Sequence, residues 1–578
     1  MAAGMVLRMK KERRYAYLFS ALILSLLFLY PWLTKDFVGI EHDTFFHLSR
    51  IEGLAQEISR RNFLPAVYPG KNGGYGYAGP LFYCDILLYP SALLYLAGLP
   101  LSWCYISAVF LFTFFTAYFM DLLIDDLTGK PSVSIAIAAA YLFCNYRITD
   151  VYVRSALGEV AAMMFLPVLL RGLFRVLYQE QYECWTLLCA GLTGLAFSHN
   201  LTFLMGVVLF IITALTQRAW KNRRAMKALV LSAGIAFLLT AWFTLPMIEQ
   251  LRAQDLYVSW YAKHSDLSNG ALRPGRYFIN HTIFGYSGKQ YASNEAMVVN
   301  PGWFLMFASL PALYLKRLKN RRFVLTCLIL GWIFMILPSD LIPWKYLSFL
   351  SVLQFPWRLM TPASLLLCVP CAAVLSRLRY EALRAVVLVI LLCEGLWHVH
   401  PVYTRTFGIT SDTLYSDITE GKICDPYYSA TYMRVELAGG DYLPQDSPDF
   451  RDYKPAVRTG NSDILNIEWE KNGHELTLTV PEEYRGVMIE VPLTWYKGYQ
   501  VYYRDNDRLV PAETARDSRA LVSFTAENSG QYLCRYESTG FRKLCIGISL
   551  LSWISVAAWA AMKKTGKQLP DFILRILP

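Results

Sequence analysis

The chain has 578 residues, of which 55% are hydrophobic and only 17% are charged. Soluble domains usually carry about 25% charged residues, so lipid must cover much of this chain, which excludes an ordinary soluble protein. The net charge of +11 does not indicate nucleic-acid binding, because the basic residues form short clusters between apolar runs. We therefore expect an α-helical polytopic protein of the cell (cytoplasmic) membrane, with membrane lipids and no nucleic acid as partners.

The first predicted element is the apolar run 15–34, which follows a cluster of basic residues. A run of this length can span a bilayer, and no small-residue cleavage site follows it. We predict a retained signal-anchor helix with a cytoplasmic N-terminus, because basic residues favour the cytoplasmic side.

Eleven further apolar runs are long enough for spans, which gives about 12 in all. With a cytoplasmic N-terminus, 12 spans place the later basic clusters and the C-terminus on the cytoplasmic side of the membrane. Another apolar run, 81–98, contains Asp85 and Pro90. Counting it as a span would put most basic clusters outside, so we predict a re-entrant or membrane-surface helix. The eleven runs are 103–122, 131–147, 157–177, 183–198, 201–216, 226–247, 301–316, 322–338, 359–377, 383–399 and 541–562.

The spans also predict the domain organisation. A transmembrane domain should carry two large outer loops, and an extracytoplasmic β-rich domain should lie between the last two spans. The predicted ranges are 1–399 for the transmembrane domain, 35–102 and 248–300 for its loops, 400–540 for the β-rich domain, and 541–578 for the final helix and cytoplasmic tail.

The prediction of a β-rich domain rests on the alternation of apolar and polar residues. Leu476, Leu478 and Val480 alternate with polar residues after Asn472-Gly473, which is a hairpin signal. Further alternating stretches around 501–503 and 521–524 indicate a small β-sandwich. Cys424 and Cys534 could pair there if the compartment is oxidising.

The first outer loop opens with Glu41-His42-Asp43, followed by His47. A carboxylate at a membrane boundary is desolvated, which raises its pKa and suits a general base. The alternative is structural: Asp43 would cap a helix over 45–58. Further along, Tyr75 and Tyr77 lie in a glycine-rich stretch that suits a sugar or lipid head group. The alternative there is an ordinary surface loop.

A short loop between two spans, 145–159, is dense in ionisable groups. Arg147 and Arg154 are candidates for gripping a phosphate. Glu159 falls at the edge of a span, where a charge needs a use or a partner. The alternative is an internal ion pair between an arginine and a carboxylate.

Two further residues are expected on the outer side. His199 is a candidate proton carrier or phosphate donor, or else a structural histidine between two helices. Arg358, in Gln354-Phe355-Pro356-Trp357-Arg358, is placed to bind an anionic head group, or else to anchor the chain at the interface. The sequence shows no nucleotide-binding loop, serine hydrolase motif or zinc motif in a suitable context.

Together these motifs resemble the GT-C superfamily of polytopic glycosyltransferases, in which an acidic motif follows the first span. Glu41-His42-Asp43 matches the E-x-D form. More narrowly, the order of Glu41–Asp43, Gly74–Tyr77, Gln354–Arg358 and Pro492–Tyr499 is similar to YfhO-type and pyruvoyl-tetrahydropterin-synthase-related bacterial membrane proteins.

The resemblance implies transfer of a sugar from a polyprenyl-phosphate donor to an extracytoplasmic acceptor, which is a surface polysaccharide, a teichoic acid or a lipid. Asp43 would be the general base, with Glu41 assisting it or sharing a divalent metal, Mg²⁺ or Mn²⁺. His42 between the two acids departs from the double-acidic motif, which counts against the metal. The alternatives from other classes are a transporter or flippase for lipid-linked glycans, and an assembly scaffold.

Overall fold

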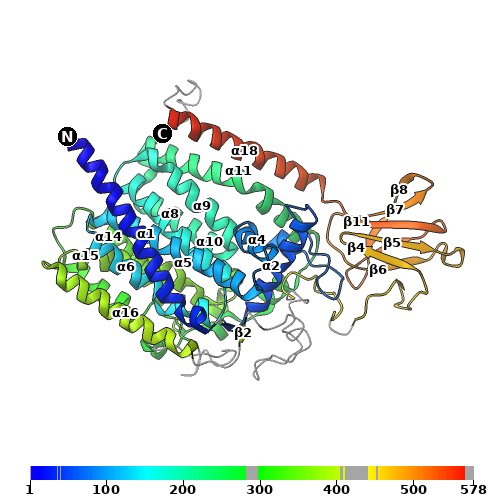
Figure 1. The fold of residues 1–578 in the computed structure, drawn as a ribbon, viewed down its shortest axis with the longest axis horizontal. Coiled ribbons are helices and arrows are strands. Elements are labelled where there is room, and N and C mark those ends of the chain that lie inside the picture. Colours follow the sequence, from blue (N-terminus) through cyan, green and yellow to red (C-terminus); the bar gives the residue numbers. More distant parts are fainter. Residues whose placement is uncertain are drawn as a thin grey trace.

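The computed structural model describes residues 2–35, 37–39, 41–280, 297–403, 408–410, 440–450 and 453–565. Within these ranges a large body of packed helices carries a smaller β region at one end (Figure 1). The predicted fold class, a helical membrane protein with a C-terminal β-sandwich-like domain, is confirmed.

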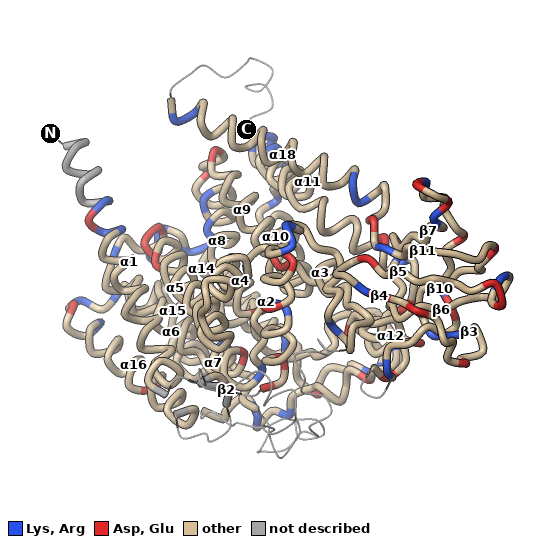
Figure 2. Tube along the Cα trace, turned by 45° about the vertical axis from the view of Figure 1, so that its right-hand side comes forward, with Lys and Arg blue, Asp and Glu red and all other residues tan. Residues whose placement is uncertain are grey.

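In the described residues, seven helices are long and apolar enough to cross a membrane. Each coincides with a predicted span. Figure 2 shows that charged residues are sparse along these helices and frequent at their ends and on the β region. The spans run through α1 (Ala2–Lys35), α5 (Leu101–Thr128), α8 (Leu157–Leu173), α11 (Arg223–Ala253), α15 (Met360–Leu375), α16 (Glu381–Tyr403) and α18 (Gly540–Thr565). The span of α8 continues to Tyr178, and that of α15 starts at Pro356.

The other five predicted spans are shorter helices. The run 131–147 is broken: α6 ends at Leu142, and a separate helix α7 (Asn145–Tyr152) carries the polar residues that follow. The run 81–98 holds α4, whose eight residues are too few to cross a bilayer. The shorter helices are α6 (Pro131–Leu142), α9 (Trp185–Ser198), α10 (Asn200–Thr216), α13 (Trp303–Ser309) and α14 (Arg321–Ile336).

Close helix packing in this body depends on small residues. A Cβ on Gly191 of α9 would lie 2.7 Å from the Cα of Leu169 on α8. Backbones approach this closely only where a side chain is missing, as is usual between membrane helices. This packing fixes α8, whose first turn carries Glu159.

The first loop is largely structured. Its principal helix, α2, is amphipathic and buries most of its residues. Arg50 of α2 donates to Asp85 at 2.7 Å, and Tyr68 donates to the other oxygen of that carboxylate. This buried network ties α2 to the segment before α4. The loop elements are α2 (Thr44–Ser59), α3 (Gly79–Phe82), α4 (Tyr89–Leu96) and β1 (Phe37–Gly39), which pairs with β2 (Gly408–Thr410).

The β region consists, in its described part, of two antiparallel sheets, one in the order β3-β6-β10-β9 and one in the order β4-β5-β11-β7-β8. The predicted hairpin is confirmed, with Gly473 and His474 as its two turn residues. Cys534 is buried in β11, and Cys424 lies outside the described residues. The strands are β3 (Arg458–Thr459), β4 (Trp469–Asn472), β5 (Glu475–Val480), β6 (Met488–Thr494), β7 (Tyr499–Asp505), β8 (Arg508–Ala512), β9 (Thr514–Arg516), β10 (Leu521–Thr525) and β11 (Gly530–Tyr536).

The β region and the first loop share one hydrophobic core. Val67 and Phe82 of the loop pack in the same cluster as Leu478 and Val501 of the strands. Lys471 of β4 also donates to the carbonyl of Pro69 at 2.8 Å. The first loop therefore links the helical body to the β region.

Candidate active site

Asp43 occupies the position just before α2 but does not cap the helix with its side chain. Instead, its backbone N–H donates to the carbonyl of Arg154 at 3.0 Å, which fixes the turn against the segment after α7. Its carboxylate makes no hydrogen bond within the described residues and is partly exposed. The capping alternative is therefore wrong, and the carboxylate remains available for a ligand.

The surroundings of Asp43 raise the pKa of its carboxyl group. Desolvation by the surrounding protein raises the pKa of Asp43 to about 6, although the positive charge of Arg154 opposes the shift. The negative charge of Asp441 adds to the increase, and Arg358 counteracts it. A carboxylate with a pKa this close to neutrality is a stronger base than an ordinary aspartate and is still mostly ionised at pH 7.

Beneath Asp43 lies a buried ionic network around Arg154. The guanidinium forms ion pairs with Asp150 of α7 and with Glu159 of α8, the latter at 2.8 Å. Tyr146 donates to Glu159 at 2.7 Å, and Thr361 of α15 donates to the same oxygen. The internal ion pair that the sequence left open is the one that forms. Arg154 and Glu159 therefore support the site rather than extend from it.

Arg147 forms no ion pair with this network within the described residues. It is fully buried and donates to Thr113 of α5 at 3.2 Å and to the sulfur of Met163 at 3.4 Å. A side chain with no exposed surface and only internal partners does not reach a ligand. We therefore withdraw the prediction that Arg147 grips a phosphate.

Arg358 is a second cation, after Arg154, whose charge acts on Asp43. It lies in a short 3-10 helix before α15, is partly exposed, and donates to the carbonyl of Leu353 at 3.1 Å and to the side chain of Gln354. Within the described residues it forms no ion pair with a carboxylate. The rings of Phe355 and Trp357 lie 5.3 and 5.9 Å from its guanidinium carbon. This arrangement holds the guanidinium while leaving donors for an anion.

His199 and Tyr83 lie next to each other, with ring centroids 6.0 Å apart. His199 precedes α10, and its Nδ1 accepts a hydrogen bond from the backbone N–H of Thr202. Desolvation lowers the pKa of His199 to about 3, so the ring is neutral at pH 7. A neutral ring that accepts at Nδ1 carries its proton on Nε2, where it is a donor.

Tyr83 was missed by the sequence analysis. A Cβ on Gly158, in the first turn of α8, would lie 1.6 Å from the Tyr83 hydroxyl oxygen. Only glycine at this position lets the hydroxyl lie over the start of α8. Behind Tyr83 a small hollow is lined mostly by apolar residues, among them Leu87, Phe112 and Phe197.

The other two residues of the acidic motif, Glu41 and His42, differ in their exposure to solvent. Glu41 is buried, whereas His42 is partly exposed. Desolvation and the charge of Arg154 lower the pKa of His42 to about 3, so it is neutral at pH 7. His47 is buried, with its Nδ1 3.0 Å from Arg50 Nη1. His47 therefore belongs to the packing of α2.

Tyr75 and Tyr77 are both fully buried, contrary to the expectation of exposed ring faces. The hydroxyl of Tyr75 donates to the carbonyl of Lys454 at 3.1 Å, and its ring packs on Phe450. Tyr75 thus joins the first loop to the segment before β3. The glycine-rich stretch folds into the core shared with the β region, and we withdraw its predicted contact with a sugar.

Asp441 is a candidate that sequence reasoning did not find. Its exposed side chain belongs to a segment bonded to α12 (Tyr257–His264), where the N–H of Val258 donates to the Asp441 carbonyl at 2.9 Å. The next residue, Tyr442, stacks on Phe82, with centroids 5.3 Å apart and planes 7° apart. We call Asp43, Tyr83, His199, Arg358 and Asp441 the Asp43 cluster.

The described residues contain no group of three or more His, Cys, Asp or Glu side chains arranged to hold a metal ion. Glu41 and Asp43 alone supply two carboxylates. Mg²⁺ commonly keeps several waters and takes one or two carboxylates, so these residues are compatible with such an ion. Metal use stays a prediction.

No protein-family model matches the chain, and no curated protein matches it either. Among solved structures, the chain is similar to the arabinofuranosyltransferase AftD from mycobacteria, with a TM-score of 0.47 and 13% identity. The match covers 70% of this chain and 28% of AftD. The chain thus spans less than a third of the length of that protein.

Proposed function

We propose that the protein is a GT-C-type membrane glycosyltransferase that moves a sugar from a polyprenyl-phosphate donor to an acceptor hydroxyl. The observation that carries the proposal is that Asp43 and Arg358 belong to one cluster, in which the charge of Arg358 acts on the pKa of Asp43. Asp43 is a partly exposed carboxylate with a raised pKa and no structural use for its side chain. Arg358 is a partly exposed cation in the same cluster, without a carboxylate partner among the described residues.

These two groups match the two demands of the reaction. The acceptor oxygen attacks the anomeric carbon of the sugar while the bond from that carbon to the lipid phosphate breaks. The phosphate leaves with the electron pair, and Asp43 takes the proton of the acceptor hydroxyl. Arg358 binds the departing phosphate, whose charge increases in the transition state, and the Nε2–H of His199 is an additional donor.

The hollow behind Tyr83 is where we place the start of the lipid chain of such a donor. Its apolar walls come from the turn at 86–88 and from α5, α8 and α9, next to the Asp43 cluster. A polyprenyl chain that begins in this hollow would place its phosphate beside Tyr83 and His199. The proposed metal, Mg²⁺ or Mn²⁺ at Glu41 and Asp43, would be tested by chelation followed by restoration with each ion.

The deciding experiment replaces Asp43 with Asn in the full chain, reconstituted with polyprenyl-phosphate sugars that are radiolabelled in the sugar. We expect transfer to fall by about 10²- to 10⁴-fold, the usual contribution of a general base. The matched control is Asp507→Asn, the same change at an exposed turn of the β region. Transfer at the wild-type rate by Asp43→Asn would overturn the assignment.

The stability of the variant separates a catalytic role from a structural one. Asp43 must ionise against its desolvated surroundings, so the neutral amide should leave the protein no less stable at pH 7. Thermal unfolding in detergent checks this. A loss of transfer together with a loss of stability would assign Asp43 to the fold instead.

A further inference from the structure

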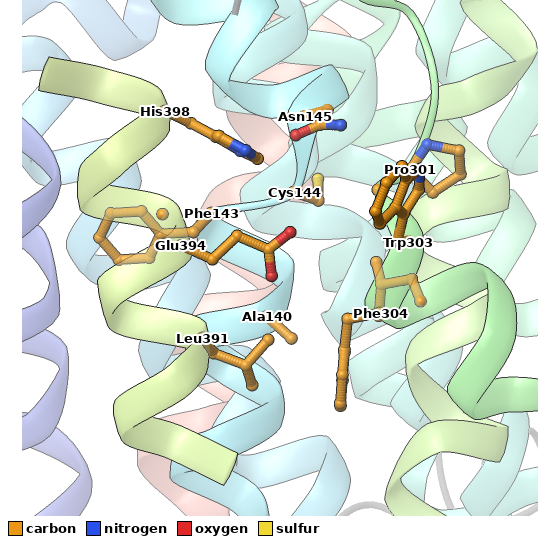
Figure 3. A pocket seen from close by; sticks show the side chains of 13 residues that line it. Ala140, Phe143, Cys144, Asn145, Pro301, Trp303, Phe304, Leu391, Glu394 and His398 are labelled. Carbon is orange, nitrogen blue, oxygen red and sulfur yellow. The ribbon is translucent and has the colours of Figure 1, made fainter. Parts of the chain in front are cut away.

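A second, small pocket lies between α16, the end of α6 and the start of α13. Figure 3 shows Glu394 and His398 directed into it from α16, with Asn145 beside them and the rings of Trp303 and Phe304 on the opposite wall. None of the Asp43 cluster lines this pocket, so it is a separate site.

Glu394 is unusual because of the helix that carries it. α16 is one of the seven helices that are long and apolar enough to cross a membrane. Glu394 lies nine residues before Tyr403, about 14 Å from the end of the helix at 1.5 Å per residue. A carboxylate within the apolar length of a span is costly and usually marks a functional site.

The partners of Glu394 do not balance its charge. One carboxylate oxygen accepts a hydrogen bond from the side chain of Asn280 at 2.8 Å. In the described part of the chain, no lysine or arginine forms an ion pair with it. The amide of Asn145 is engaged with Asn280 and with Asn300, the latter at 3.0 Å. The amide of Asn280 therefore orients the carboxylate, and no lysine or arginine of the described residues neutralises it.

The opposite wall is aromatic and held in place. The indole N–H of Trp303 donates to the carbonyl of Phe278 at 3.1 Å, and 46% of the Trp303 surface is exposed. On the other side, Gly395 lets α16 approach α6, since a Cβ there would lie 2.4 Å from the ring of Phe143. A carboxylate beside aromatic faces is the environment that binds an organic cation.

The two helices that line the pocket also expose apolar side chains. Ile390 of α16 and Phe307 of α13 are 58% and 49% exposed. We propose that this pocket binds an ammonium group carried on an apolar body, with Glu394 as its counter-ion and Trp303 as a cation–π partner. An aminolipid head group and a free amine are the two sources of this chemistry.

The test uses the full chain in detergent, incubated with equal amounts of phosphatidylethanolamine and phosphatidylglycerol that have the same acyl chains. Native mass spectrometry measures which lipid is retained. We expect wild type to prefer phosphatidylethanolamine by about tenfold, the effect of one well-placed interaction. Glu394→Gln should remove the preference. The matched control, Glu381→Gln, changes an exposed glutamate on the same helix and should keep it.

Two further measurements, on Trp303 variants and with free ethanolamine, complete the test. Trp303→Leu should reduce the preference and Trp303→Phe should retain it, which shows the cation–π contact if Glu394→Gln fails to fold. Displacement of the lipid by millimolar free ethanolamine would support the ammonium chemistry and assign it to a free amine. Equal retention of both lipids by wild type together with no binding of free ethanolamine, or an unchanged preference in a folded Glu394→Gln protein, would overturn the proposal. Neither outcome depends on sugar transfer.

Discussion

The Asp43 cluster and the Glu394 pocket differ in how their charges are compensated, although adjacent residues of α7 contribute to both. Tyr146 donates to Glu159 beneath the Asp43 cluster, whereas Asn145 lines the Glu394 pocket. Beneath Asp43, Arg154 forms ion pairs with two buried carboxylates of the protein. In the Glu394 pocket, the described residues supply hydrogen bonds and aromatic faces but no cation.

The difference shows how a charge inside an apolar body indicates its role. A buried charge with an internal partner is part of the scaffold, because burial without compensation is too costly. A partly exposed charge without such a partner is available to a ligand. By this criterion Arg154 is structural, while Asp43, Arg358 and Glu394 are the groups to test.

The largest effect should come from removing the internal compensation. Arg154→Gln leaves Asp150 and Glu159 buried without a countercharge, which should cost about 3–5 kcal/mol of stability. Thermal or denaturant unfolding in detergent measures the loss. The control is Arg171→Gln, because Arg175 also pairs with Asp126 and keeps that carboxylate compensated. Equal stability of the two variants would contradict the scaffold role of Arg154.

A smaller effect, confined to binding, is expected at Arg358. Arg358→Gln removes a charged donor but breaks no ion pair of the described chain, so stability should change little. Affinity for polyprenyl phosphate should fall by about 1.5–3 kcal/mol, the usual value of hydrogen bonds to a charged group. Binding of the sugar-free lipid phosphate checks this, with the exposed Arg273→Gln as control. Unchanged affinity would remove Arg358 from the site.

Much of the architecture could be predicted from local patterns. Apolar runs predicted the seven long helices, and alternation with Asn472-Gly473 predicted the β hairpin. The short spans were less clear, because hydropathy does not reveal that the polar residues from Asn145 onward start a new helix. Run length alone cannot distinguish a full span from a helix packed within the body.

The site was only partly predictable, for a related reason. The motif 41–43 indicated Asp43, and the sequence left open whether Arg154 binds a ligand or an internal carboxylate. Deciding this required Asp150 and Glu159 in three dimensions. Asp441 could not be found at all, since it lies about four hundred residues from Asp43 along the chain and no local motif marks it. Its role depends on the segment bonded to α12.

The smallest predicted effect concerns Asp441 and the pH dependence of transfer. Asp43 acts as a base only when ionised, so activity should fall as the pH drops through about 6, the pKa of Asp43. The negative charge of Asp441 contributes to that raised pKa. Asp441→Asn removes the charge, so the pKa of Asp43 should fall and the acid limb of the rate profile should move to lower pH.

The shift should be partial, because desolvation is the main cause of the raised pKa and remains in the variant. The matched control is Asp446→Asn in the same segment, where Asp446 pairs with Arg516 away from the cluster. Its acid limb should coincide with that of wild type. If Asp441→Asn moved the limb to higher pH, or left it in place while Asp446→Asn moved it, Asp441 would not face Asp43. The β-side segment would then cover the site without acting on its chemistry.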